Sequence, residues 1–188
     1  MSELFKAHIA RIVTITDEEF AYVLSHFKVK RLKKHQFLIQ EGEIVLNDHW
    51  VEKGLLKAYH TDEDGKERIL QFAMEDWWIS DYQALANSTR ATLQIDCIEN
   101  AQLLVLSAEN REKLCNELHS MANFFRKKSN AGYNALLKRI LLLLNKDPKS
   151  RYDQLLQLNP LLLQRVPKTL LASYLGVSRQ ALSRLNQD

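Results

Sequence analysis

The segment 166–185 constrains the fold of this 188-residue chain more than any other part of its sequence. Pro167 suits the first turn of a helix, where no backbone N–H donor is needed. Gly176 can adopt the left-handed conformation that ends a helix, and Ser178 is a preferred N-cap for a second helix. Ala172 is small, so the second helix can cross the first closely. The segment therefore predicts two short helices that meet at a sharp turn, a helix-turn-helix.

Polar side chains remain on the outer face of the second helix, and their types suit nucleic acid. Arginine pairs with guanine, and glutamine with adenine, through two hydrogen bonds each. A recognition helix contacts bases with its N-terminal residues. Two short helices at a sharp turn also occur in many all-α proteins, but the capping serine and flanking arginines make this pattern more selective. The residues expected to contact DNA are Lys168, Thr169, Ser178, Arg179, Gln180, Ser183 and Arg184.

The distribution of charge agrees with this interpretation. From Lys138 onward the chain has nine cations and three anions, a net charge of +6. Because the whole chain carries +3, the part before Lys138 carries −3. A basic end on a slightly acidic body is typical of nucleic-acid-binding proteins. A solvated helical face is the alternative explanation of the same charges.

Composition places the chain among globular proteins that can bury a core. Hydrophobic residues make up 46% and charged residues 26%. The densest apolar run, 140–144, is far too short to cross a bilayer. The N-terminus has no basic segment followed by an apolar one, so no signal peptide is expected. Two cysteines are too few for a disulfide framework. We therefore expect a cytoplasmic, reduced protein without a membrane partner.

Short runs with strand character fill the middle of the chain. The runs are 35–40, 49–51, 55–59, 68–72, 91–97 and 102–106. Asp64-Gly65 lies between two of them, which is a strong hairpin signal. Many short strands at close spacing favour a small barrel or jelly roll.

Helical patterns surround this β-rich region. Thr16 and Glu19 form a capping-box signature, which predicts a helix from about residue 16 to residue 27. Ser107 resembles the start of another helix. A long apolar stripe follows, at nearly helical spacing: Met121, Phe125, Tyr133, Leu137, Ile140 and Leu144. Such a stripe favours a partner helix from a second copy of the chain, with packing inside its own chain as the alternative.

Gly132 interrupts the stripe, at a cost of about 1 kcal/mol relative to alanine. We take it as the break between two domains. The expected division is a sensor domain with the dimerisation helix at 1–131 and a DNA-binding domain at 132–188. Three prolines, at 148, 160 and 167, are expected to divide the second domain into short helices.

With these motifs in place, the chain resembles the Crp/Fnr family of transcription regulators, which includes the cyclic-AMP receptor protein. The segment 166–185 is similar to that family's helix-turn-helix. The segments 52–57, 64–72 and 75–78 resemble, in order, successive turns and strands of its β-roll. The likeness covers nearly the whole chain. It implies an α+β fold: an N-terminal β-roll or jelly-roll domain of the cyclic-nucleotide-binding kind, a long dimerisation helix and a C-terminal helix-turn-helix domain.

The chain departs from the family pattern where cyclic AMP would bind. Family members that bind it supply a Gly-Glu pair and then an Arg-Ser pair in this cassette. Gap-free alignment places Ile79-Ser80 and Arg90-Ala91 at those positions. Arg90 could hold an anion, although a surface or salt-bridged arginine is the simpler reading. Ser80, Asp81 and Arg90 are the candidate effector-pocket residues, and we expect no response to cyclic AMP.

These observations predict a homodimeric transcription regulator that binds double-stranded DNA. Its effector is unknown, if one exists. The alternative is a ligand-binding regulatory module of the cyclic-nucleotide-domain type that does not bind DNA. No Ser/His/Asp set, metal-ligand spacing or phosphate-binding glycine loop indicates an enzyme. An iron–sulfur sensor needs about four cysteines, so no cofactor and no metal site are expected.

Overall fold

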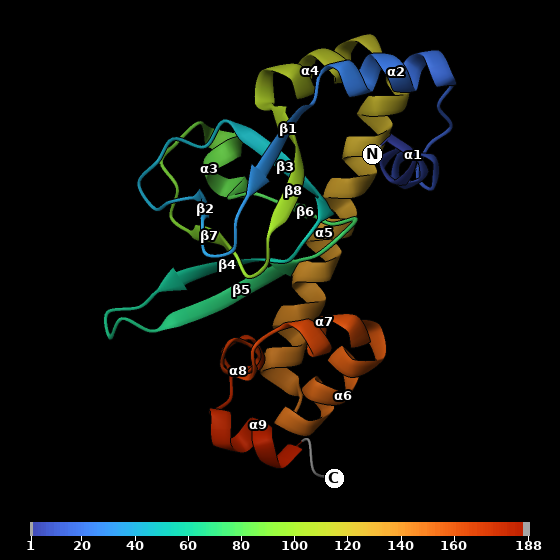
Figure 1. Cartoon of the computed structure of the whole chain (residues 1–188). Coiled ribbons are helices and arrows are strands. Elements are labelled where there is room, and N and C mark those ends of the chain that lie inside the picture. The colour runs from blue at the N-terminus through green and yellow to red at the C-terminus, as the bar shows by residue number, and fades with distance from the viewer. Residues whose placement is uncertain (1, 186–188) are drawn as a thin grey trace. The chain divides into compact units, whose positions relative to one another are not determined.

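A computed structural model describes residues 2–185 (Figure 1). The chain divides into two compact units. The β-roll unit comprises Met1–Ala58 and Phe72–Ala131, and the helical unit comprises Tyr59–Gln71 and Gly132–Asp188. These units differ from the expected division into 1–131 and 132–188 in one segment, because the hairpin 59–71 groups with the C-terminal helices.

Eight strands in the described part of the chain form two four-stranded sheets. They are β1 (Lys28–Leu32), β2 (Phe37–Ile39), β3 (Asn47–Lys53), β4 (Leu56–Thr61), β5 (Glu67–Ala73), β6 (Trp78–Ile79), β7 (Gln94–Cys97) and β8 (Ala101–Ser107). The strand orders are β1-β8-β3-β6 and β2-β7-β4-β5. Consecutive strands often lie in different sheets, which is the arrangement of a β-roll.

A shared apolar core explains why these strands close into a roll. Leu56, Ile79, Ile95 and Leu103 come from four different strands in the two sheets, and each is fully buried. Burial of such a side chain contributes about 1.5–3 kcal/mol relative to leaving it exposed. The expected α+β class with an N-terminal β-roll is therefore confirmed.

Helices form a second core in the β-roll unit, against the β1-β8-β3-β6 sheet. They are α1 (Ser2–Ala10), α2 (Asp17–Ser25), α4 (Ala108–Glu117) and the first half of α5 (His119–Asn145), whereas α3 (Tyr82–Asn87) follows β6. Phe5, Trp50, Leu114 and Phe124 are fully buried in this second core.

Both helix starts that the sequence predicts in this unit are confirmed. The Thr16 hydroxyl accepts a hydrogen bond from the Glu19 N–H, and the Glu19 carboxylate accepts one from the Thr16 N–H, which completes the capping box. The Ser107 hydroxyl caps α4 by accepting from the Asn110 N–H at 3.1 Å. The first of these helices ends at Ser25, two residues before the expected end.

Gly132 does not interrupt α5, which runs from His119 to Asn145, and the expected division into 1–131 and 132–188 stays a prediction. One glycine disfavours a helix by about 1 kcal/mol. That is small beside the backbone hydrogen bonds of a helix of 27 residues. A methyl group at Gly132 would meet no atom within 4 Å, so no packing contact requires a glycine there.

Four short helices follow in the helical unit. They are α6 (Pro148–Leu158), α7 (Pro160–Arg165), α8 (Lys168–Leu175) and α9 (Arg179–Leu185). Pro148 and Pro160 lie in the first turns of α6 and α7, and Pro167 is the N-cap of α8. The prolines therefore divide this region as the sequence predicts. The buried side chains that join these helices are Tyr152, Leu155, Leu162, Val166, Leu171, Ala172, Leu175 and Leu182.

Candidate nucleic-acid interface

The turn between α8 and α9 has the backbone geometry that segment 166–185 predicts. Gly176 has a φ of 67° and closes α8 with hydrogen bonds to carbonyls of its last turn. The Val177 N–H donates to the Ala172 carbonyl at 3.0 Å, so the carbonyls at the helix end are satisfied. The Ser178 hydroxyl then accepts from the Ala181 N–H at 3.1 Å and caps α9. A helix-turn-helix is the result.

Apolar anchors fix the two helices and turn their polar faces outward. Leu171 and Leu175 on α8 and Leu182 on α9 are at most 4% exposed. All seven residues expected to contact DNA are exposed. They lie at the start of α8, in the turn and along α9. Donors to phosphates and base edges are therefore available at the start of α9, where a recognition helix uses them.

Two of the seven residues expected to contact DNA line the same depression. Thr169 and Arg179 line a depression of about 250 Å³ together with Ser173 and with the hairpin residues Lys66 and Arg68. Lys168 instead lines a different hollow, of similar volume, beside apolar side chains of α6 and α7. Neighbouring residues at the start of α8 thus face different surroundings.

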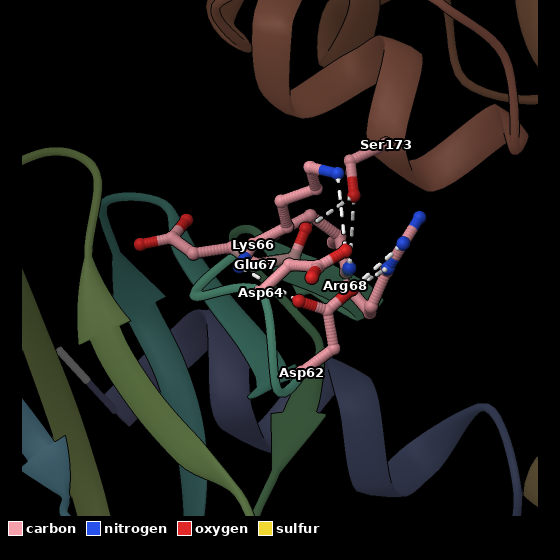
Figure 2. Close-up of polar contacts among 7 residues, drawn as sticks. Asp62, Asp64, Lys66, Glu67, Arg68 and Ser173 are labelled. Atoms are coloured by element: carbon pink, nitrogen blue, oxygen red, sulfur yellow. Dashed lines mark hydrogen bonds and ion pairs between the residues drawn. The ribbon is translucent and has the colours of Figure 1, made fainter.

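The hairpin formed by β4 and β5 reaches α8 through Ser173 (Figure 2). The Ser173 hydroxyl donates to the Glu67 carbonyl at 2.6 Å and accepts from the Ile69 N–H at 3.2 Å. Sequence reasoning did not identify this contact. The Asp64-Gly65 turn indicates the hairpin, but no sequence signal pairs it with a serine more than 100 residues away.

Arg139 on α5 strengthens the same contact. Its Nη2 atom donates to the carbonyls of Ile69 and Tyr174, at 3.1 and 3.0 Å. The guanidinium carbon lies 3.5 Å from the centroid of the Tyr174 ring, close enough for a cation–π interaction. Burial lowers the pKa of Arg139, but a guanidinium stays charged at physiological pH.

Two of the candidate effector-pocket residues are occupied by structural hydrogen bonds. Ser80 and Asp81 are buried. The Ser80 hydroxyl donates to the Asn47 carbonyl at 2.8 Å. The Asp81 carboxylate caps α3 by accepting from the Ala84 N–H, and it also accepts from the Thr92 N–H and hydroxyl. Both side chains hold the segment around α3 in place.

Arg90, the third candidate, is exposed and donates to the Gly42 carbonyl at 2.6 Å. Its backbone pairs with Ile44 in an isolated β-bridge. The structure thus gives Arg90 a backbone partner in the neighbouring loop. A role for the three residues in effector binding stays a prediction.

Membrane-spanning helices and metal sites are both absent from the described residues. None of the helices within residues 2–185 is long and apolar enough to cross a membrane. Over the same part of the chain, no group of three or more His, Cys, Asp or Glu side chains is arranged as a metal site.

Comparison with known proteins supports the fold described above. Residues 29–117 match the family model of the cyclic nucleotide-binding domain. No curated protein sequence matches the chain. The solved structures similar to it include FixK2 from Bradyrhizobium japonicum, with a TM-score of 0.74 and 16% identity over 86% of this chain and 83% of that one.

Two further solved structures extend over more of this chain. A CooA mutant from Carboxydothermus hydrogenoformans has a TM-score of 0.69 and 22% identity, covering 94% of this chain and 85% of its own. The regulator CLP from Xanthomonas campestris has a TM-score of 0.68 and 15% identity, covering 92% and 90%.

These findings define a protein in which a β-roll precedes a helix-turn-helix. The chain shares its fold with the solved structures of FixK2, CooA and CLP, and its residues 29–117 match the family model of the cyclic nucleotide-binding domain. The resemblance that the sequence motifs indicate is therefore confirmed at the level of the fold.

Proposed function

We propose that this chain is a sequence-specific DNA-binding transcription regulator that acts as a homodimer. The helix-turn-helix carries the proposal. Its caps and apolar anchors are in place, and the seven polar residues Lys168, Thr169, Ser178, Arg179, Gln180, Ser183 and Arg184 are exposed around the start of α8 and along α9. In this role α9 enters the major groove, while the start of α8 meets the phosphate backbone.

The second half of α5 supports the homodimer. Its apolar side chains are from 40% to 74% exposed in the single chain: Tyr133, Leu136, Leu137, Ile140, Leu141, Leu143 and Leu144. Contiguous apolar surface of this kind marks an interaction site. A second copy of α5 would cover it, and two recognition helices would then face two half-sites.

The effector is unknown, and we propose that it is not cyclic AMP. Ser80 and Asp81 are buried and hydrogen-bonded to their own surroundings. Ile79, at the expected glycine position, is fully buried. The structure of CLP is described as that of a c-di-GMP-responsive regulator, so one protein of this fold responds to a small molecule other than cyclic AMP. A regulator of this kind acts in the cytoplasm and needs no catalytic site.

The alternative is a regulatory module that binds a ligand but no DNA. It would leave the exposed arginines of α9, Arg179 and Arg184, without a role. Selection from random duplex DNA with the purified full chain distinguishes the two functions. We expect a palindromic consensus whose binding weakens with salt, and we expect Arg179→Ala to relax it. Failure of the wild-type protein to enrich any sequence would favour the alternative.

A further inference from the structure

The β4–β5 hairpin presents the edge of a sheet to α8. β5 is the last strand in the order β2-β7-β4-β5. The backbone groups along such an edge lack a strand partner and need another one. Ser173 supplies it by bonding both the Glu67 carbonyl and the Ile69 N–H (Figure 2). The Ser173 hydroxyl thus makes hydrogen bonds to two backbone groups of β5 that a neighbouring strand would otherwise pair.

Arg139 donates a hydrogen bond to the next group along the same edge, the Ile69 carbonyl. It donates a second one to the Tyr174 carbonyl of α8. Three backbone groups of β5 in close succession are therefore bound by side chains of the helical unit. Ile69 itself is only 3% exposed. The contact is specific, since it depends on a serine and an arginine at defined positions.

The docked hairpin is acidic. Residues 62–68 contain four carboxylates and two cations, which gives a net charge of −2. Both cations lie against carboxylates of the hairpin itself. Arg68 pairs with Asp62 at 2.7 Å, and Lys66 lies 3.4 Å from Asp64. Their positive charge is therefore largely balanced within the hairpin.

This acidic hairpin borders the proposed DNA contacts. Glu67 and its neighbours line the same hollow as Thr169 and Arg179. A phosphate held by either residue would lie within about one Debye length, roughly 8 Å at physiological salt, of the excess negative charge. Arg179 and Gln180 remain exposed, so the docked hairpin does not cover the start of α9, and it would oppose DNA through its charge rather than its bulk.

We propose that the β4–β5 hairpin is an autoinhibitory element. Docked on α8 through Ser173 and Arg139, it lowers the affinity of the helix-turn-helix for DNA, and its release raises that affinity. Docking and DNA binding then compete, so by linkage DNA weakens docking as much as docking weakens DNA binding. This inference rests on the proposed DNA-binding function.

Two kinds of variant of the full chain test it by different routes. Ser173→Ala removes two of the hydrogen bonds that hold the hairpin and leaves the one from Arg139. Glu63→Gln, at an exposed position of the hairpin turn, keeps those bonds and removes one negative charge from the hairpin. Glu112→Gln, an exposed acid on α4, is the matched control. Affinity for the selected operator is measured by fluorescence anisotropy at low and high salt, and exchange of the Ile69 amide is measured by NMR with and without DNA.

We expect Ser173→Ala and Glu63→Gln to bind DNA roughly three- to tenfold more tightly than wild type at low salt, with a smaller gain at high salt. Glu112→Gln should match wild type. The Ile69 amide should exchange faster in Ser173→Ala, and faster in wild type once DNA is bound. If wild type binds its operator and neither variant binds more tightly, the hairpin does not inhibit and only this inference falls. If wild type and variants alike bind no DNA, the proposed function falls with it.

Discussion

The Lys128 ammonium lies 2.6 Å from the Asp48 carboxylate, inside the β-roll unit. Asp48 is 1% exposed and also accepts a hydrogen bond from the Tyr82 hydroxyl. The ammonium lies 3.7 Å from the centroid of the Trp78 ring. Burial lowers the pKa of Lys128, and Asp48 opposes that shift. This buried pair fastens the first half of α5 to β3.

Lys128→Met should therefore destabilise the protein by about 3–5 kcal/mol, because it leaves a buried carboxylate without its cation. Replacing both partners, with Asp48→Asn added to Lys128→Met, should recover much of this loss. Urea unfolding of wild type, the single variant and the double variant measures the difference. A single variant as stable as wild type would show that the pair is not a structural anchor.

His49, next to Asp48, should make the protein sensitive to acid. Burial lowers its pKa to about 4, and its Nδ1 lies 3.3 Å from the Ile79 carbonyl. A histidine that is neutral when folded but titrates near 6.5 when unfolded contributes full stability only above pH 6.5. That stability is lost as the pH falls from 6.5 toward 4, by up to about 3 kcal/mol.

Unfolding free energies of wild type and His49→Gln between pH 7 and pH 4 test this directly. The variant should lose stability less steeply over that range, because it has no proton to take up at this position. Equal slopes for the two proteins would mean that other groups govern the acid sensitivity.

Much of the fold can be predicted from the sequence because it depends on local signals. The turn at Gly176, the caps at Thr16, Ser107 and Ser178, and the Asp64-Gly65 hairpin each follow from a few adjacent residues. The strand β1 (Lys28–Leu32) is not predicted, because four of its five residues are exposed and the run is rich in cations. Alternation between buried and exposed side chains, the usual strand signal, is therefore absent.

Contacts between distant residues are beyond sequence reasoning of this kind. Asp48 and Lys128 are 80 positions apart, and Glu67 and Ser173 are 106 apart. Each depends on how whole elements pack. The continuity of α5 through Gly132 is also not predictable from that residue alone. A glycine weakens a helix only slightly, so the neighbouring turns decide whether the helix continues. The exposed residues of α9 are predictable because their exposure follows from local helical spacing.

Base recognition should depend on Arg179. Arg179→Ala is expected to weaken binding to the best operator by about 1–3 kcal/mol and to relax the preferred sequence. Lys168→Ala, which removes a proposed phosphate contact, should instead weaken binding evenly on all sequences. Anisotropy titrations of both variants on the operator and on single-base variants separate these effects. An unchanged sequence preference in Arg179→Ala would place the recognition surface elsewhere.

Cyclic AMP should not regulate this protein. A carboxylate that bonds the ribose is worth about 1.5–3 kcal/mol, so its replacement by Ser80 lowers affinity roughly 10- to 100-fold. Ser80 is also engaged with the Asn47 carbonyl. Calorimetry with cyclic AMP and cyclic GMP should detect no binding at micromolar concentrations. Low-micromolar binding of either nucleotide, coupled to tighter operator binding, would restore Arg90 as a phosphate ligand.

The symmetry of the DNA complex tests the central claim most directly. If α5 pairs two chains, each complex contains two recognition helices. A footprint on the selected operator, combined with the mass of the complex, should then show two chains on two half-sites. Their centres should lie about one helical turn apart, roughly 10 bp, or a multiple of it. Leu144→Glu, which places a charge in the exposed apolar stripe, should lose this complex. A single chain protecting a single half-site would contradict the account.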